Sequence, residues 1–410
     1  MGFGSCKWSS VKKFQTHVDF SPANREFNEM RYQVRGVSHT ALSHLLAGFL
    51  RENMPQIKTL IVNDVSDSSL SREANSAIID CFLPQLTMLQ SESAVTFTNQ
   101  LAANLNSIRV RIGPSRLNIL PGLVPEQLTL IELAGVPKAF NWSYFDRSEQ
   151  QSGEINFANL LSLKLIFNGQ ENNHDARLGT HKVVFPKLEK LAIVGWFQNF
   201  SLFEAAVFPA HLQRLEFSEC LDAMVEITNT QTIQTTDSLA ISIMQRVPEH
   251  LFYQITNYYF GANNPSTFNE LYIGFHTFSH MPLDDLNWHS LLFLQLNNTI
   301  GFDQTLALLA RCPKLKELSI SNMSFDETDA EFIVLPPDLS VKKIILLSSY
   351  RYDMIEYIQK CIRHLVIGLK QLSYLITNID VFEFLKNLII KEKSAYTHLK
   401  NLVLNEGDLF

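Results

Sequence analysis

The chain contains short segments in which apolar residues occupy the first, fourth and sixth positions and polar residues lie between them. The clearest copy is Leu212, Leu215 and Phe217, followed by Cys220. Apolar residues two positions apart, with a polar residue between them, are typical of a strand that buries one face. The segments therefore predict many short strands, each with one face in a core and one face outside it.

The segment recurs through most of the chain, at intervals that average about 26 residues, within the range of leucine-rich repeats. Between the segments, apolar residues three and four apart indicate helices, most clearly at 70–82, 305–310, 354–369 and 381–390. Several segments follow an X-Pro pair, which ends a helix and leads into extended chain. The first apolar positions of the predicted repeats are Ile57, Leu86, Leu105, Leu128, Leu160, Leu188, Leu212, Thr236, Phe268, Leu291, Leu315, Val341, Leu372 and Leu399.

Strand followed by helix, repeated, predicts an α/β fold: a leucine-rich-repeat solenoid of horseshoe shape. A parallel β-sheet is expected on its concave face and helices on its convex face. We expect residues 54–410 to form the solenoid from about 14 irregular repeats, and residues 1–53 to form an N-terminal capping segment. One repeat cannot fold alone, because each large buried side chain contributes only about 1.5–3 kcal/mol, against about 1–2 kcal/mol for ordering each residue.

Two polar stretches interrupt the repeats. Residues 141–156 and 168–180 are rich in Asn, Asp, Ser, Gln and Gly, which is typical of loops. We expect both to extend from one edge of the sheet. Two interpretations stay open: the stretches are binding loops, or they are solvent-exposed insertions that bind nothing.

The residues between the buried strand positions form columns along the exposed face of the predicted sheet. The middle column is charged in the centre of the chain, then polar and aromatic, and apolar at its C-terminal end. Proteins bind such mixed surfaces through a few aromatic and charged residues. The middle column comprises Ile61, Gln90, Arg109, Glu132, Lys164, Ala192, Glu216, Ala240, Tyr272, Gln295, Ser319, Ile345, Ile376 and Val403. The candidate protein-binding residues on this concave face are Lys164, Arg214, Glu216, Tyr272, Phe293 and Gln295.

The composition narrows the possible functions and compartments. A formal net charge of −7 disfavours a general nucleic-acid binder, although it allows a local basic patch. The five cysteines are far apart and form no C-x-x-C pair, which favours reduced, buried thiols in the cytoplasm or nucleus. The N-terminus lacks the apolar stretch of a signal peptide, and no apolar run is long enough to span a membrane.

Motifs of common catalytic sites are not found in the sequence. Glycine-rich phosphate loops and the G-x-S-x-G and H-E-x-x-H patterns do not occur. His276 and His280 have a spacing that binds zinc on a helix, but no Cys or acidic residue follows before Asp284. We therefore expect a protein that is not an enzyme, with no metal, no cofactor and no small-molecule substrate.

Two units resemble repeats of fungal F-box proteins, within the ribonuclease-inhibitor-like class: F-P-K-L-E-K-L-A-I at 185–193 and C-P-K-L-K-E-L-S-I at 312–320. The resemblance covers residues 54–404. It implies a protein-interaction scaffold that serves as the substrate-recognition subunit of a cullin-type ubiquitin ligase and binds the ligase adaptor. No F-box is found, so residues 1–53 either follow a lost F-box or belong to a chain that never had one. The alternative is a regulator or inhibitor that wraps a single protein target without a ligase.

Overall fold

The computed structural model of the chain forms two compact units, each built on parallel strands. The first unit comprises Met1–Leu212 and Asp222–Ile233, and the second comprises Gln213–Leu221 and Gln234–Phe410. The structure describes residues 13–16, 58–62, 79–80, 83–94, 102–112, 122–137, 140–145, 153–167, 181–195, 202–220, 223–224, 227, 233–243, 269–275, 288–325, 334–347, 355–377 and 379–404.

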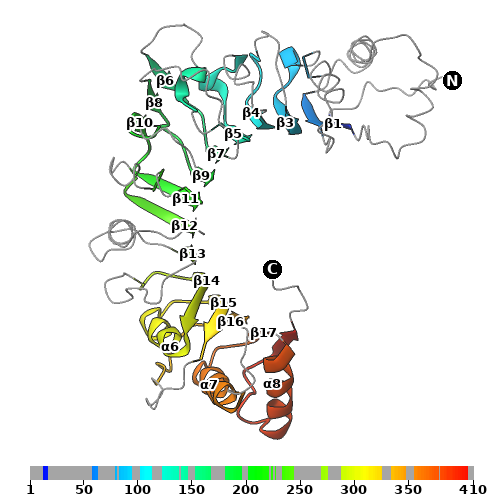
Figure 1. Ribbon diagram of the computed structural model, residues 1–410, viewed down its shortest axis with the longest axis vertical. Coiled ribbons are helices and arrows are strands. Elements are labelled where there is room, and N and C mark those ends of the chain that lie inside the picture. Colours follow the sequence, from blue (N-terminus) through cyan, green and yellow to red (C-terminus); the bar gives the residue numbers. More distant parts are fainter. Residues whose placement is uncertain are drawn as a thin grey trace, which may run out of the picture. The chain divides into compact units, whose positions relative to one another are not determined.

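The first unit contains an open parallel sheet whose strands neighbour one another in chain order (Figure 1). Strand β1 lies in the segment predicted to cap the array, so this sheet begins one strand before the first predicted repeat. A smaller parallel sheet has the order β10-β8-β6. The larger sheet comprises β1 (Lys13–Thr16), β2 (Thr59–Val62), β3 (Met88–Ala94), β4 (Ser107–Arg111), β5 (Leu130–Ala134), β7 (Ser162–Phe167) and β9 (Lys190–Gly195). The other elements are β6 (Glu154–Asn156), β8 (Lys182–Val184), β10 (Ala206–Val207) and the 3₁₀-helices η2 (Leu83–Gln85), η4 (Pro125–Gln127) and η5 (Trp142–Phe145).

The second unit also contains an open parallel sheet in chain order, and here α-helices connect the later strands. Figure 1 shows these helices on one side of strands β14–β17. The strands are β11 (His211–Ser218), β12 (Thr235–Ile243), β13 (Glu270–Phe275), β14 (Phe293–Gly301), β15 (Glu317–Ser324), β16 (Lys343–Leu346), β17 (Tyr374–Thr377) and β18 (Asn401–Leu404). The helices are α6 (Phe302–Arg311), α7 (Ile355–Gly368) and α8 (Ile379–Lys391).

The predicted α/β class with a parallel sheet is confirmed, and the open sheets are compatible with a solenoid. The helical spacings at 305–310, 354–369 and 381–390 correspond to α6, α7 and α8. Most of the predicted helix at 70–82 lies outside the described residues.

The predicted register of the strands is confirmed at each pairing that is described within a unit. Middle-column residues are Cα partners from Ile61 to Ala192 in the first unit. They are partners again from Ala240 to Val403 in the second unit. The buried residues beside them fix this register, because a slip of one residue would turn every leucine of a strand to the other face.

A ladder of aromatic rings forms much of the core of the first unit. Phe157, Phe185 and Phe208 each follow a strand of the smaller sheet directly. Phe185 stacks between the other two, with ring centroids 5.1 Å from Phe157 and 5.4 Å from Phe208. Trp142 lies 5.4 Å from Phe185, and its Nε1–H donates a 2.7 Å hydrogen bond to the Leu202 carbonyl. Burying large rings with this polar atom satisfied stabilises the unit.

The predicted polar loop at residues 141–156 is wrong at both ends. Its first residues form η5, where Trp142 and Phe145 are only 4% and 2% exposed. Asn141 folds back locally, because its Oδ1 accepts a 3.0 Å hydrogen bond from the Ser143 N–H. The last residues of the predicted loop, Glu154–Asn156, form β6. Residues 146–152 and the second predicted loop at 168–180 lie outside the described residues.

In the second unit, helix α6 packs its apolar face into the core. Leu309 on this face is fully buried. At the N-terminus of the helix, the Gly301 N–H donates a 3.2 Å hydrogen bond to Gln304 Oε1. Burial raises the pKa of the Cys312 thiol, just after α6, and of the Cys361 thiol in α7 to about 12. Both are free and buried, as predicted, and they stay protonated at neutral pH.

Candidate functional site

The outward face of each sheet carries the side chains that alternate with the buried leucines. In the strands β4, β5, β7, β9 and β11 to β16 this face has three columns: the middle column, the residues two positions before it and the residues two positions after it. In β7, for example, Lys164 lies between Leu163 and Leu165, which are 1% and 0% exposed, while Lys164 itself is partly exposed. The outward face is therefore where charged and aromatic side chains are presented to the surroundings.

An aromatic pair lies on the outward face of the second unit. The rings of Tyr272 on β13 and Phe293 on β14 have centroids 4.9 Å apart. The Arg214 guanidinium, from β11, lies 5.7 Å from the centroid of the Tyr272 ring. Ala240 is the Cα partner of Tyr272 on the intervening strand β12, and its small side chain leaves room for this contact. The result is a continuous cation–aromatic–aromatic row across four strands.

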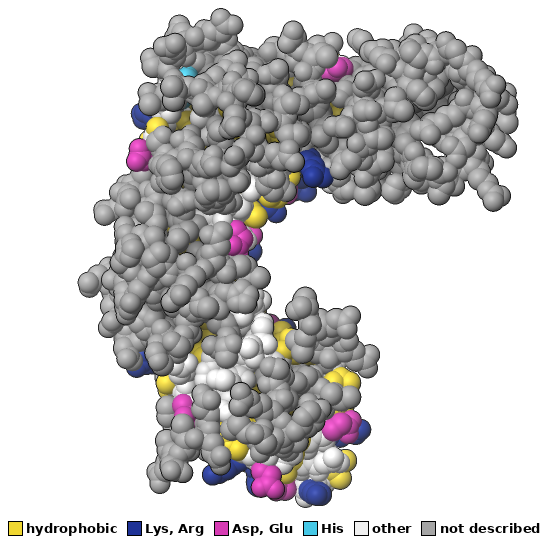
Figure 2. All heavy atoms as spheres, viewed as in Figure 1, with side chains coloured by type: hydrophobic (Ala, Val, Ile, Leu, Met, Phe, Trp, Pro, Cys, Tyr) yellow, Lys and Arg dark blue, Asp and Glu magenta, His cyan; other side chains and the backbone are white. Residues whose placement is uncertain are grey.

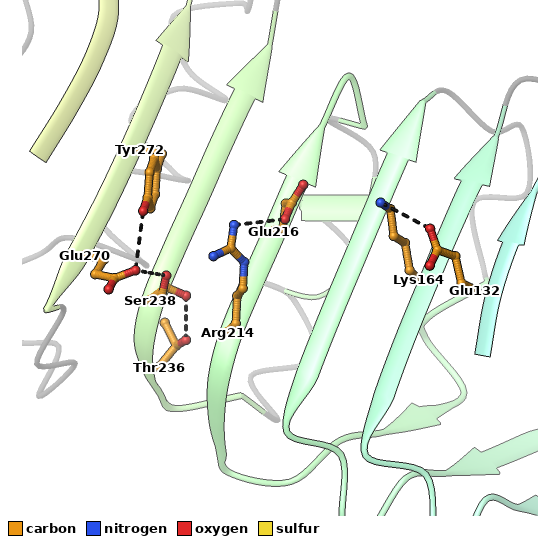
Figure 3. Close-up of polar contacts among 8 residues, drawn as sticks. All are labelled: Glu132, Lys164, Arg214, Glu216, Thr236, Ser238, Glu270 and Tyr272. Atoms are coloured by element: carbon orange, nitrogen blue, oxygen red, sulfur yellow. Dashed lines mark hydrogen bonds and ion pairs between the residues drawn. The ribbon is translucent and has the colours of Figure 1, made fainter. Parts of the chain in front are cut away.

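Two carboxylates border this row (Figure 3). Glu216 pairs with Arg214 at 3.3 Å. Glu270 accepts hydrogen bonds from the Ser238 hydroxyl at 3.2 Å and from the Tyr272 hydroxyl at 3.5 Å. Partial burial raises the pKa of Tyr272, the negative charge of Glu270 raises it further, and Arg214 opposes both. Tyr272 therefore stays a hydrogen-bond donor at neutral pH.

We call Arg214, Glu216, Glu270, Tyr272 and Phe293 the aromatic–charged cluster. Four of its members, all except Glu270, were candidate binding residues in the sequence, and the structure brings them together. Glu270 and its partner Ser238 lie two positions before the middle column and were missed, because the prediction took only Arg214 and Phe293 from that column. Reading the column that already contains Arg214 and Phe293 would have found them.

Gln295 lies beside the cluster, as the Cα partner of Tyr272 on β14. Its Nε2–H donates a 3.0 Å hydrogen bond to Asn297 Oδ1, which also accepts one from the Ser321 hydroxyl at 2.9 Å. Gly274 is next to this polar strip, and a Cβ there would lie 3.3 Å from the Ser242 hydroxyl. Small and amide side chains thus continue the outward face beyond the aromatic pair.

Lys164 lies on the outward face of the first unit, whereas the cluster belongs to the second. Its Nζ is 3.4 Å from the Glu132 carboxylate (Figure 3). The Nε of Arg109 is 3.6 Å from the same carboxylate. All three side chains are at least one-third exposed. Figure 2 shows basic, acidic and apolar side chains exposed next to one another in this part of the molecule.

The chain matches no model of a known protein family, and no curated protein resembles it closely enough to count as a relative. Within the described ranges, no group of three His, Cys, Asp or Glu side chains is placed to hold a metal ion. None of the helices in the described part of the chain has both the length and the apolar character needed to cross a bilayer. His276 and His280 lie outside the described residues.

Proposed function

We propose that this protein is an interaction scaffold that binds another protein on the outward face of its parallel sheet. The observation that carries the proposal is the aromatic–charged cluster. Arg and Tyr are enriched among residues that dominate protein-binding energy, and here Arg214 and Tyr272 support one another on a sheet. Because their rotamers are already constrained, less side-chain entropy is lost on binding.

The proposal includes the finer fold assignment. A leucine-rich-repeat solenoid, with the parallel sheet on a concave face and helices on a convex face, accounts for the spacing of the buried leucines and the confirmed register. In such a solenoid the outward face of each strand adds a position to one extended binding surface.

The proposal covers two roles, which differ in the proteins that the chain would bind. As the substrate-recognition subunit of a cullin-type ligase, the chain would bind a substrate on the sheet and a ligase adaptor elsewhere. As a ligase-independent regulator, it would wrap one protein target. The resemblance of the repeats 185–193 and 312–320 to those of F-box proteins supports the first role.

The test compares the proteins that co-purify with the tagged wild-type chain and with the triple variant Arg214→Ala, Glu216→Ala, Tyr272→Ala. Loss of a partner from the variant is expected, with an affinity reduced about thirtyfold once the partner is purified, since a few central residues carry most of the binding energy. The matched control is Lys182→Ala, Glu154→Ala, Val207→Ala, which removes an ion pair and an exposed apolar side chain from the smaller sheet.

Both variants should keep the wild-type circular dichroism spectrum, because all six side chains are at least partly exposed. A cullin and its adaptor among the recovered proteins would support the ligase role, and one stoichiometric partner without them would support the regulator role. If the triple variant retains every partner at wild-type affinity, the cluster is not the binding site and the proposal fails.

A further inference from the structure

Strands β4, β5, β7 and β9 of the first unit carry an excess of basic residues on their outward face. The cations are Arg109, Arg111, Lys164 and Lys190, and the only carboxylate in the three columns of these strands is Glu132. Four positive charges and one negative charge give this patch a net charge of +3, whereas the whole chain has a formal net charge of −7. We call these five residues the basic patch.

The register places the basic residues on different columns of adjoining strands. Arg109, Glu132 and Lys164 are consecutive Cα partners in the middle column. Arg111 is in the column after it, opposite Ala134, and Lys190 is in the column before it, opposite Ser162. Since neighbouring strands are about 4.8 Å apart and a strand rises about 3.3 Å per residue, the line from Arg111 to Lys190 crosses the four strands obliquely over about 20 Å.

The charges of this patch are incompletely balanced within the protein. Glu132 is shared by Arg109 and Lys164, at 3.6 and 3.4 Å, and can neutralise only one of them. Arg111 and Lys190 are exposed, and no ion pair joins either to another described residue. Among the described residues, two full positive charges therefore have no carboxylate partner at the ends of the line.

The side chains between the cations are small or apolar, so they do not screen these charges with carboxylates. They are Ser107, Leu130, Ala134, Ser162, Ile166, Ala192 and Val194. Cations on a low-polarity surface interact with an incoming anion more strongly than cations surrounded by water. The serine hydroxyls supply additional hydrogen-bond donors to a carboxylate.

We infer that the basic patch binds an acidic segment of a protein partner, with Asp or Glu side chains next to Arg109, Arg111, Lys164 and Lys190. The inference rests on the proposed function and names the chemistry of the partner. A stretch of about 20 Å accepts about six residues of extended peptide, which matches a short acidic run. A peptide is favoured over a nucleic acid because the charge of −7 on the whole chain repels a long polyanion beyond this patch.

The test uses fluorescence anisotropy with the full-length protein and a labelled peptide of about twelve residues that alternates Glu and Ser, long enough to exceed the patch. Binding is expected, and it should weaken as NaCl is raised from about 0.05 to 0.5 M, because exposed charges are screened. The variant Arg111→Glu, Lys190→Glu should reduce affinity about ten- to thirtyfold, since each reversal replaces attraction by repulsion. Neither substitution breaks a described ion pair, so the fold should be retained.

The matched control is Lys314→Glu, Lys370→Glu, which makes the same change in net charge at exposed positions of the second unit. It should leave peptide affinity within about twofold of wild type, because neither lysine belongs to the outward columns that contain the basic patch. Equal loss in both variants would show a net-charge effect and would overturn the inference. So would wild-type affinity in the Arg111/Lys190 variant, or tighter binding of a single-stranded oligonucleotide of equal charge.

A failure here is distinguishable from a failure of the proposed function. If the acidic peptide does not bind but the Arg214, Glu216, Tyr272 variant still loses its protein partner, only the basic patch is assigned wrongly. If that triple variant retains all partners, the scaffold proposal fails whatever the peptide does.

Discussion

Within the described residues, the two units have the same pattern of strand pairing but differ in the elements seen between the strands and in what their outward faces display. In the first unit the described connections contain the strands β6, β8 and β10 and the stacked rings of Phe157, Phe185 and Phe208. In the second unit they contain the helices α6, α7 and α8. Since both arrangements maintain the same pairing of middle-column residues, the buried positions within the strands, and not the type of connection, set the register.

The outward faces differ in charge as well. Strands β4 to β9 of the first unit's larger sheet carry the basic patch. In the second unit the corresponding columns of β11 to β16 contain two cations, Arg214 and Lys343, and three carboxylates, Glu216, Glu270 and Glu317. There Lys343 pairs with Glu317 at 2.7 Å and Arg214 with Glu216 at 3.3 Å. One chain thus presents a basic region with a net charge of +3 and an aromatic region with a net charge of −1, in which each cation is paired with a carboxylate.

Aspartate at a buried strand position should have the largest effect, and it should be equally severe in both units. Leu163→Asp in β7 and Leu215→Asp in β11 each place a charge at a position that is 1% or 0% exposed. Each should cost more than about 4 kcal/mol and abolish the cooperative thermal transition. Gln213→Asp, at an exposed position of β11, should leave the melting temperature almost unchanged. Wild-type melting of Leu215→Asp would refute the register.

Truncating one buried side chain in each unit should destabilise mainly the unit that contains it. Phe185→Ala takes the middle ring out of the ladder and should cost about 3–5 kcal/mol, through lost burial and the cavity that remains. Leu309→Ala, in α6, should cost about 2–5 kcal/mol. Hydrogen exchange should report lost protection in β7 and β9 for the first variant and in β14 and β15 for the second, because repeats couple mainly to their neighbours. Uniform loss over both units in either variant would contradict this expectation.

A smaller effect is expected from a methyl group at the end of β9. Gly195 has φ +86°, and a Cβ on it would overlap the carbonyl oxygen of Phe167. Gly195→Ala should therefore destabilise the first unit by about 1–3 kcal/mol in urea denaturation. Gly153→Ala is the control, since its Cβ would lie 3.8 Å from the His181 ring and in ordinary contact, and its stability should change by less than about 0.5 kcal/mol.

The sequence predicted the strands of the larger sheets well because a period of two with large apolar residues has one physical solution, a half-buried strand. It missed β6, β8 and β10, which are only two or three residues long. The signal for them was present as the recurring phenylalanine that follows each strand, at Phe157, Phe185 and Phe208. Its meaning depends on ring stacking between repeats, which no single repeat reveals.

The error at residues 141–145 has a similar origin. Asn141 was grouped with the polar residues that follow it, whereas its side chain accepts a local hydrogen bond from Ser143. The aromatic residues Trp142, Tyr144 and Phe145 were the better guide, because rings of this size are seldom clustered in a solvent loop.

The sequence predicted which candidate residues lie on the outward face, but it did not predict which of them contact one another. Alternation placed Arg214, Glu216 and Tyr272 on the outward face, which the structure bears out geometrically. The contact of Arg214 with Tyr272 depends on the small side chain of Ala240 between them, and so on the pairing of three strands. Lys164 belongs to the first unit and the cluster to the second, a division that the repeat pattern does not encode.

The pairing of each strand with its neighbours along the chain, in one constant register, has a consequence for how such a protein changes in evolution. Duplication or deletion of a whole repeat within a unit would lengthen or shorten the outward face by about 4.8 Å and leave the columns on the other strands intact. An insertion of one residue inside a strand would instead exchange its buried and outward side chains. Viable length variants should therefore differ by whole repeats, and each added strand would extend the range of partners that the surface can recognise.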